Sequence, residues 1–186
     1  MARVVHSYDD PDRFVAGTVG EPGARTFFLQ ARSGNRLTSV ACEKEQVMAL
    51  AERLDVMLDE VARRFDREPA AQVGLDDTDP LEQPITEEFR VGTMTLSWDP
   101  TDERVVLEIF AMSDDVEDLS DDVDDEGEPT EVLLVRLTPA YARAFVKRAG
   151  LVVEAGRPSC PFCGNPVDPE GHLCVRANGF KRRDPV

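Results

Sequence analysis

The stretch RFVAGTVGEPGARTFFLQARSGNRLTSVAC (residues 13–42) determines the predicted fold. It holds three apolar or β-branched segments, separated by the turn-forming sequences GEPGA (residues 20–24) and SGN (residues 33–35). Glycine and asparagine supply the positive φ that tight hairpin turns require. The pattern therefore predicts three consecutive strands joined by hairpins, at Arg13–Thr18, Arg25–Ala31 and Arg36–Cys42.

An amphipathic helix is predicted directly after the third strand, from about Glu43 to Phe65. Acidic residues near its start and arginines near its end complement the helix dipole. Its apolar residues recur at steps of three and four, which places them in one stripe that can cover a sheet. The stripe consists of Val47, Leu50, Leu54, Leu58, Val61 and Phe65.

The same order of elements returns in the second half of the chain. Two strands, Glu88–Trp98 and Glu103–Met112, flank the turn sequence DPTD, and a third strand is predicted at Val132–Leu137. Thr138 then fits an N-cap with proline at the first helical position. The helix that follows is predicted to run to about Ala149 and to stop at Gly150.

The predicted fold is an α+β domain over residues 1–153, built from two βββα units. The sequences of two segments, Phe14–Thr18 and Phe89–Thr93, resemble each other. An internal duplication with halves 1–66 and 88–153 would explain this resemblance; chance similarity between equally buried strands is the alternative. A mainly antiparallel, six-stranded sheet with both helices on one face would bury both apolar stripes. A small C-terminal segment, residues 154–186, follows this domain.

The net charge of −16 is concentrated in two segments. Residues 113–131 hold 11 acidic residues and residues 76–88 hold 6, with no basic residue in either. Such charge runs with Pro and Gly favour solvated loops, so we interpret residues 67–87 as an acidic linker and residues 113–131 as an acidic loop. No apolar run approaches the roughly 20 residues that span a bilayer, and no signal peptide is recognised, so we expect a cytoplasmic protein.

The sequence CPFCGNPVDPEGHLC (residues 160–174) predicts a metal site. The C-x₂-C pair with a following glycine is typical of a zinc knuckle, and His172 and Cys174 complete a set of three sulfurs and one nitrogen with Cys160 and Cys163. A regular strand would place His172 and Cys174 on opposite faces, so one of them need not be a ligand. Structural zinc, a three-ligand catalytic zinc and free or redox-active thiols are the alternatives. Cys42 is interpreted as a buried residue and His6 as no ligand.

The C-terminal tail is basic. Arg176, Lys181, Arg182 and Arg183 lie around the turn sequence at Asn178. This tail can lie against the acidic loops of the same chain, or it can bind another protein or a phosphate-bearing partner. Nucleic acid is disfavoured, because the acidic loops would repel a phosphate backbone.

The N-terminal RVVHSYDDPDRFVAGTVGEPGARTFFLQA, the KEQ at residues 44–46 and the C-terminal CPFCGNPVDPEGHLCVRANGF together resemble an actinobacterial family of conserved proteins of unknown function. The resemblance implies genes near those of a histidine-phosphatase-like and a phosphatidylinositol-kinase-like protein, but no established activity and no catalytic residues. Two hypotheses follow. The first is a non-catalytic binding or adaptor module. The second is an enzyme or enzyme subunit in phosphate metabolism, in which Asp168 or Glu170 would act beside the metal.

Overall fold

The computed structural model describes residues 3–66, 75–113, 131–156, 160–165, 167, 172–174 and 176. Within these ranges it contains seven strands and two helices, which confirms the predicted α+β class. The strands are β1 (Val4–Asp9), β2 (Arg13–Val19), β3 (Thr26–Ser33), β4 (Arg36–Cys42), β5 (Glu87–Asp99), β6 (Arg104–Ala111) and β7 (Glu131–Leu137). The helices are α1 (Lys44–Arg64) and α2 (Pro139–Glu154).

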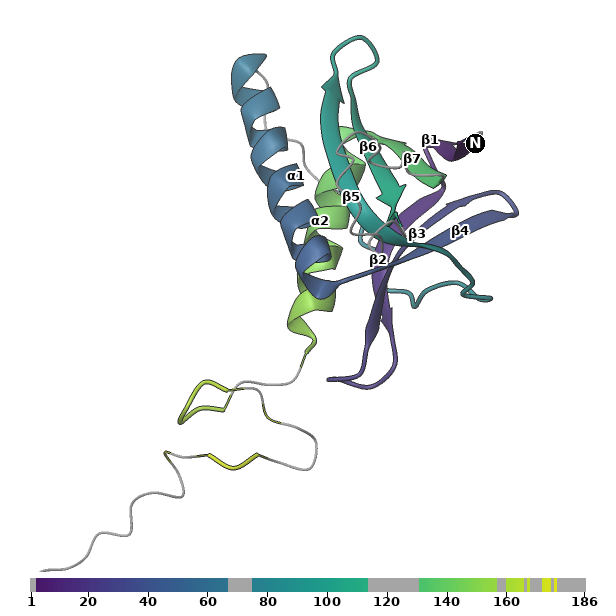
Figure 1. Cartoon of the computed structure of the whole chain (residues 1–186). Coiled ribbons are helices and arrows are strands. Elements are labelled where there is room, and N and C mark those ends of the chain that lie inside the picture. The colour runs from purple at the N-terminus through teal and green to yellow at the C-terminus, as the bar shows by residue number, and fades with distance from the viewer. Residues whose placement is uncertain are drawn as a thin grey trace, which may run out of the picture.

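The strands form one sheet in the order β1-β7-β6-β5-β4-β3-β2 (Figure 1). Strands β2–β4 and β5–β7 are each an antiparallel meander, and parallel pairing of β4 with β5 joins the two. Each meander is followed by a helix, as predicted, while the duplication itself stays a prediction. The expectation of six strands was wrong: β1 adds a seventh and pairs in parallel with β7. The hydroxyl of its buried Tyr8 hydrogen-bonds Thr38 of β4 (2.8 Å).

Both helices lie on one face of the sheet and enclose the main core with it (Figure 1). Strand alternation directs Phe14 and Leu29 to that face. Most of the predicted α1 stripe is buried there, namely Val47, Leu50, Leu54 and Leu58. Val61 is half-buried. Phe65 is exposed (44%), because it is the C-cap residue, where the chain leaves the helix.

The start of α2 follows its prediction and its end does not. Thr138 caps the helix by accepting a hydrogen bond from the N–H of Tyr141 (3.2 Å), with Pro139 at the first helical position. Gly150 does not stop the helix, which continues to Glu154. Outside the helix's own backbone and Gly150's chain neighbours, no described atom lies within 4 Å of a Cβ placed at Gly150, and a single glycine lowers helix propensity without breaking the helix.

Residues 75–86 form a strap that passes from the helices around the edge strand β2 to the other face of the sheet. Leu81 fills the space above Gly17 there and packs with Val15, Phe28 and Ala41. Four of the six acidic residues in 76–88 are exposed, as predicted for a solvated segment, but Leu81 is buried and Asp77 and Glu82 are half-buried. The apolar side chain of Leu81 covers this face of the sheet, and acidic side chains of the strap hydrogen-bond buried arginines.

Two of those arginines hold the strap through one carboxylate. Asp77 accepts hydrogen bonds from Arg13 Nε (2.6 Å), Arg13 Nη2 (2.9 Å) and Arg148 Nη1 (2.7 Å). Both guanidinium groups belong to residues that are only 8% exposed. Arg148 also donates to the Ala16 carbonyl, and the N–H of Phe14 donates to the Tyr141 hydroxyl. Side chains of α2 thus satisfy polar groups of β2, which has no neighbouring strand on that side.

Candidate metal centre

The first half of the C-terminal cluster is a tight turn at residues 160–165. Cys160 N–H donates to the Asn165 carbonyl (2.8 Å), and Gly164 N–H donates to the Cys160 carbonyl (2.9 Å). Gly164 has φ +76°, a conformation that glycine adopts without strain. The N–H of Phe162 points at Cys160 Sγ (3.5 Å), the knuckle geometry that the C-x₂-C spacing predicts. This turn places the two cysteine side chains on the same side of the backbone.

The four predicted donors meet in the structure. One ligand atom from each of Cys160, Cys163, His172 and Cys174 lies within 4.8 Å of all the others. Cys160 Sγ is 3.8 Å from Cys174 Sγ, and Cys163 Sγ is 3.2 Å from His172 Nε2. Residues 172–174 are not a regular strand, so the alternation that would separate His172 from Cys174 does not apply. Three sulfurs and one imidazole nitrogen can therefore hold a metal ion.

The dimensions of the cluster fit a tetrahedral ion. Zinc–sulfur bonds of about 2.3 Å at tetrahedral angles place two sulfurs about 3.8 Å apart, the separation of the Cys160 and Cys174 sulfurs. Both residues are 6% exposed, so water is largely kept from their sulfurs. All four cysteines of the chain are free thiols in the structure.

The electrostatics of the knuckle favour one thiolate and oppose a second. Backbone N–H groups of Cys163 and Phe162 donate to the Cys160 sulfur and lower the pKa of Cys160. For Cys163, the N–H of Asn165 acts to lower the pKa, but desolvation and the neighbouring sulfurs of Cys174 and Cys160 outweigh it and the pKa is raised. Several thiolates at this spacing repel one another, and a bound cation would remove that repulsion.

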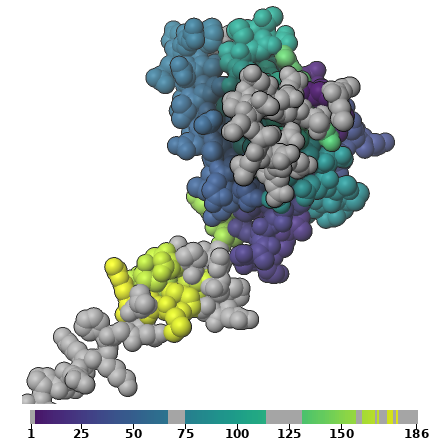
Figure 2. All heavy atoms as spheres, viewed as in Figure 1, coloured from purple at the N-terminus to yellow at the C-terminus, as the bar shows by residue number. Residues whose placement is uncertain are grey.

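Apolar side chains next to the cluster point outward. Phe162, between the knuckle cysteines, is 63% exposed, and Leu173, between His172 and Cys174, is 88% exposed. Arg176 donates to the Phe162 carbonyl (3.3 Å) and so ties the two halves of the cluster together. The described residues of this segment lie beyond the C-terminal end of α2, apart from the sheet (Figure 2).

Several predicted residues lie outside the described part of the chain. These are the tail residues Asn178, Lys181, Arg182 and Arg183, the two acids considered as catalytic partners, Asp168 and Glu170, and residues 114–130 of the acidic loop. Cys42 is buried, as interpreted from the sequence, and burial raises its pKa to about 12.

Sequence reasoning missed a second group of donors around His6. His6 Nε2 is 3.1 Å from Glu131 Oε2, and one ligand atom each from His6, Glu88 and Glu131 lie within 4.8 Å of one another. The residues come from β1, β5 and β7, so no local spacing could have revealed the group. The contact between His6 and Glu131 is explained as a partly exposed ion pair.

The fold and the site define the class of protein: an α+β domain followed by a cluster of three cysteines and one histidine that can bind a metal ion. The chain belongs to the family described as Protein of unknown function (DUF3090), whose sequence model matches residues 6–174. The matched range includes all four residues of the cluster. No curated protein and no solved structure matches the chain. Among the described residues, no helix is long and apolar enough to cross a membrane.

Proposed function

We propose that this protein is a zinc-binding, non-catalytic binding module whose C-terminal segment docks onto a partner. The observation that carries the proposal is the set of four protein donors, in which one ligand atom from each of Cys160, Cys163, His172 and Cys174 lies within 4.8 Å of the others. Structural zinc sites use four protein ligands, whereas catalytic sites keep one position for water or substrate. A tetrahedral ion held by all four donors has no such position, which argues against the interpretation as an enzyme.

The surface around the cluster supports a protein as the partner. Phe162 and Leu173 present two large apolar side chains beside a structured turn, and Arg176 lies next to them. Exposed aromatic and arginine side chains are enriched among the residues that protein partners bury as anchors, and the exposed Leu173 adds apolar area beside them. The basic residues farther along, Lys181 to Arg183, would attract acidic groups on that partner. A phosphate-bearing ligand would satisfy the basic residues but leave both apolar side chains in water.

The first experiment is metal analysis of the purified full chain and of three variants. We expect one zinc ion per chain in the wild type, loss of zinc in His172→Ala and in Cys174→Ala, and full retention in Cys42→Ala. Cys42 is the matched control, because it is a cysteine outside the cluster. Retention of zinc without His172 would indicate an open coordination position and would favour the enzyme interpretation.

The second experiment separates the metal from the docking surface. The double variant Phe162→Ser/Leu173→Ser changes two exposed side chains and no proposed ligand, so we expect it to keep its zinc. Affinity purification should then recover a partner with the wild type, lose it with the double variant, and lose it with the wild type after chelation. Recovery of the same partner with the double variant would contradict the proposed surface.

A further inference from the structure

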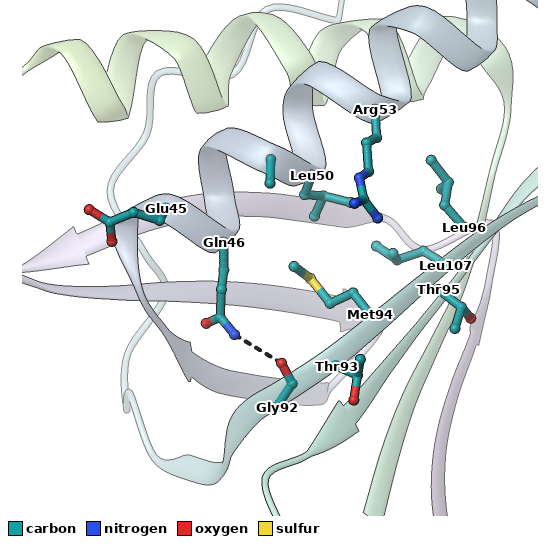
Figure 3. A pocket seen from close by; sticks show the side chains of 11 residues that line it. Glu45, Gln46, Leu50, Arg53, Gly92, Thr93, Met94, Thr95, Leu96 and Leu107 are labelled. Carbon is teal, nitrogen blue, oxygen red and sulfur yellow. Dashed lines mark hydrogen bonds between the residues drawn. The ribbon is translucent and has the colours of Figure 1, made fainter.

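A groove lies between the first three turns of α1 and strand β5, far from the cysteine cluster in the chain (Figure 3). Its volume is about 310 Å³. From α1 it is lined by Gln46, Ala49, Leu50 and Arg53, which recur at steps of three and four and share one helix face, and by Glu45 at its rim. From the sheet it is lined by residues 92–96 of β5 and by Leu107 of β6.

The groove exists because of how α1 is attached to β5. The register between β5 and β6 shifts between Val91 and Met94, so the backbone of β5 is irregular at Gly92. Gln46 Nε2 donates to the carbonyls of Val91 (3.1 Å) and Gly92 (3.0 Å), while its Oε1 accepts from Glu43 N–H (2.8 Å). This side chain ties the first turn of the helix to the irregular strand and closes one end of the groove (Figure 3).

The floor of the groove is apolar and incompletely covered. Met94 and Leu96 alternate on the helix-facing side of β5 and are only half-buried, whereas Leu50 and Leu107 beside them are buried. A half-buried apolar row between two fixed elements leaves surface that an apolar ligand can cover. Its volume lies at the lower end of the range found for small-molecule sites, about 300 to 1,000 Å³.

Arg53 supplies the one cationic group in the lining of this groove. Figure 3 shows its side chain extending from α1 toward Leu107 and Met94, while Glu45 points away on the far side of Gln46. In the part of the chain that the structure describes, Arg53 makes no hydrogen bond and no ion pair. A guanidinium above an apolar floor attracts a carboxylate, which it can bind with two parallel hydrogen bonds.

We propose that this groove binds a small organic carboxylate with an apolar body, such as a medium-chain fatty acid. At about 30 Å³ per heavy atom, the groove accommodates about ten non-hydrogen atoms. A single guanidinium matches one carboxylate better than a doubly charged phosphate. The carboxylate lies at Arg53 and the apolar body lies on the half-buried side chains of Met94 and Leu96. This proposal goes beyond the proposed function and is independent of the metal centre.

The test uses octanoate as the probe, kept below the concentration at which it forms micelles, and the full zinc-loaded chain. Binding is measured by calorimetry, and its location by amide chemical-shift changes in β5. We expect saturable binding with a dissociation constant below about 1 mM. Arg53→Gln should weaken octanoate binding by about tenfold or more, because it removes the charged hydrogen-bond donor. Arg64→Gln is the matched control on the same helix outside the groove, and it should bind octanoate as the wild type does.

A second variant tests the apolar part of the site. Ala49 is an exposed lining residue, so Ala49→Leu fills the groove without replacing a core side chain and should abolish binding. An uncharged probe of equal length, octanol, should bind more weakly than octanoate and should not distinguish Arg53→Gln from the wild type. Unsaturable binding, shifts outside the groove, or equal octanoate affinity in Arg53→Gln would overturn the proposal. Concentration-dependent dimerisation of the wild type that is lost in Ala49→Leu would also overturn the proposal, because a second copy of the chain would then occupy the groove.

Discussion

Replacement of Asp77 by asparagine should destabilise the α+β domain more than replacement of other acidic residues in the same run. The carboxylate of Asp77 accepts three hydrogen bonds from two guanidinium groups whose side chains are 9% exposed. Removing one partner of a buried ion pair costs about 3–5 kcal/mol. Here the cost is smaller, because both arginines keep carbonyl acceptors in the strap and the amide keeps one oxygen. We therefore expect Asp77→Asn to lower the free energy of unfolding by about 2 kcal/mol.

The matched control is the neighbouring residue. Asp76 pairs with Lys147 at 2.7 Å, but both side chains are at least half exposed, so Asp76→Asn should cost less than about 1 kcal/mol. Urea unfolding followed by the fluorescence of Trp98, the single tryptophan, measures both variants. Equal unfolding midpoints for the two variants would refute the conclusion that the hydrogen bonds of Asp77 to Arg13 and Arg148 stabilise the strap.

The same network predicts a pH dependence. The Arg13 side chain, which donates to the carboxylate, holds the pKa of Asp77 below its ordinary value. A carboxyl group whose pKa is lower in the folded state contributes stability that is complete above its unfolded pKa of about 3.9. That contribution is lost as the pH falls through the lower folded pKa. The difference in the free energy of unfolding between the wild type and Asp77→Asn should therefore stay constant from pH 7 to pH 5 and shrink below about pH 4. An unchanged difference at pH 3 would contradict this linkage.

Three further predictions concern other sites in the domain. Gly17→Ala places a Cβ 2.5 Å from Leu81 Cγ and should cost about 1–3 kcal/mol in thermal unfolding, less when combined with Leu81→Ala. Tyr141→Phe removes the acceptor of the Phe14 N–H (2.9 Å) and should cost about 1 kcal/mol, measured by urea unfolding, with faster aggregation through the uncovered edge of β2. Burial raises the pKa of Cys42 to about 12, so in metal-free protein at pH 8 a thiol reagent should label Cys42 only after unfolding.

The fold could be predicted where it depends on local patterns. Turn sequences rich in glycine and asparagine delimit β2 to β4, and the apolar stripe of α1 requires a sheet face to cover. The strap could not be predicted, because Asp77 has the local appearance of a solvated acid. Its partners Arg13 and Arg148 lie 64 and 71 positions away, and only the folded sheet brings them together.

The two candidate sites differ in the same way. The cluster lies within 15 residues of chain, so its spacing alone predicted the four side chains that the structure brings together. What the spacing could not decide was whether His172 and Cys174 face the same point, since that depends on the backbone between them. The groove had no sequence signal, because Arg53 and Met94 are ordinary residues of a helix and a strand until their elements are packed.

The position of the metal cluster explains why its neighbours can be exposed. A segment of about 30 residues cannot bury enough apolar surface to fold on its own, and short domains of this size depend on a metal or disulfides. If a zinc ion replaces the hydrophobic core, Phe162 and Leu173 are not needed inside the segment and remain on its surface. Among the described residues of 160–176, Cys160, Cys163, Cys174 and Arg176 make hydrogen bonds to other members of the same segment. Under the proposed function, removal of zinc should therefore unfold the proposed docking surface and abolish partner binding, while the α+β domain keeps its stability.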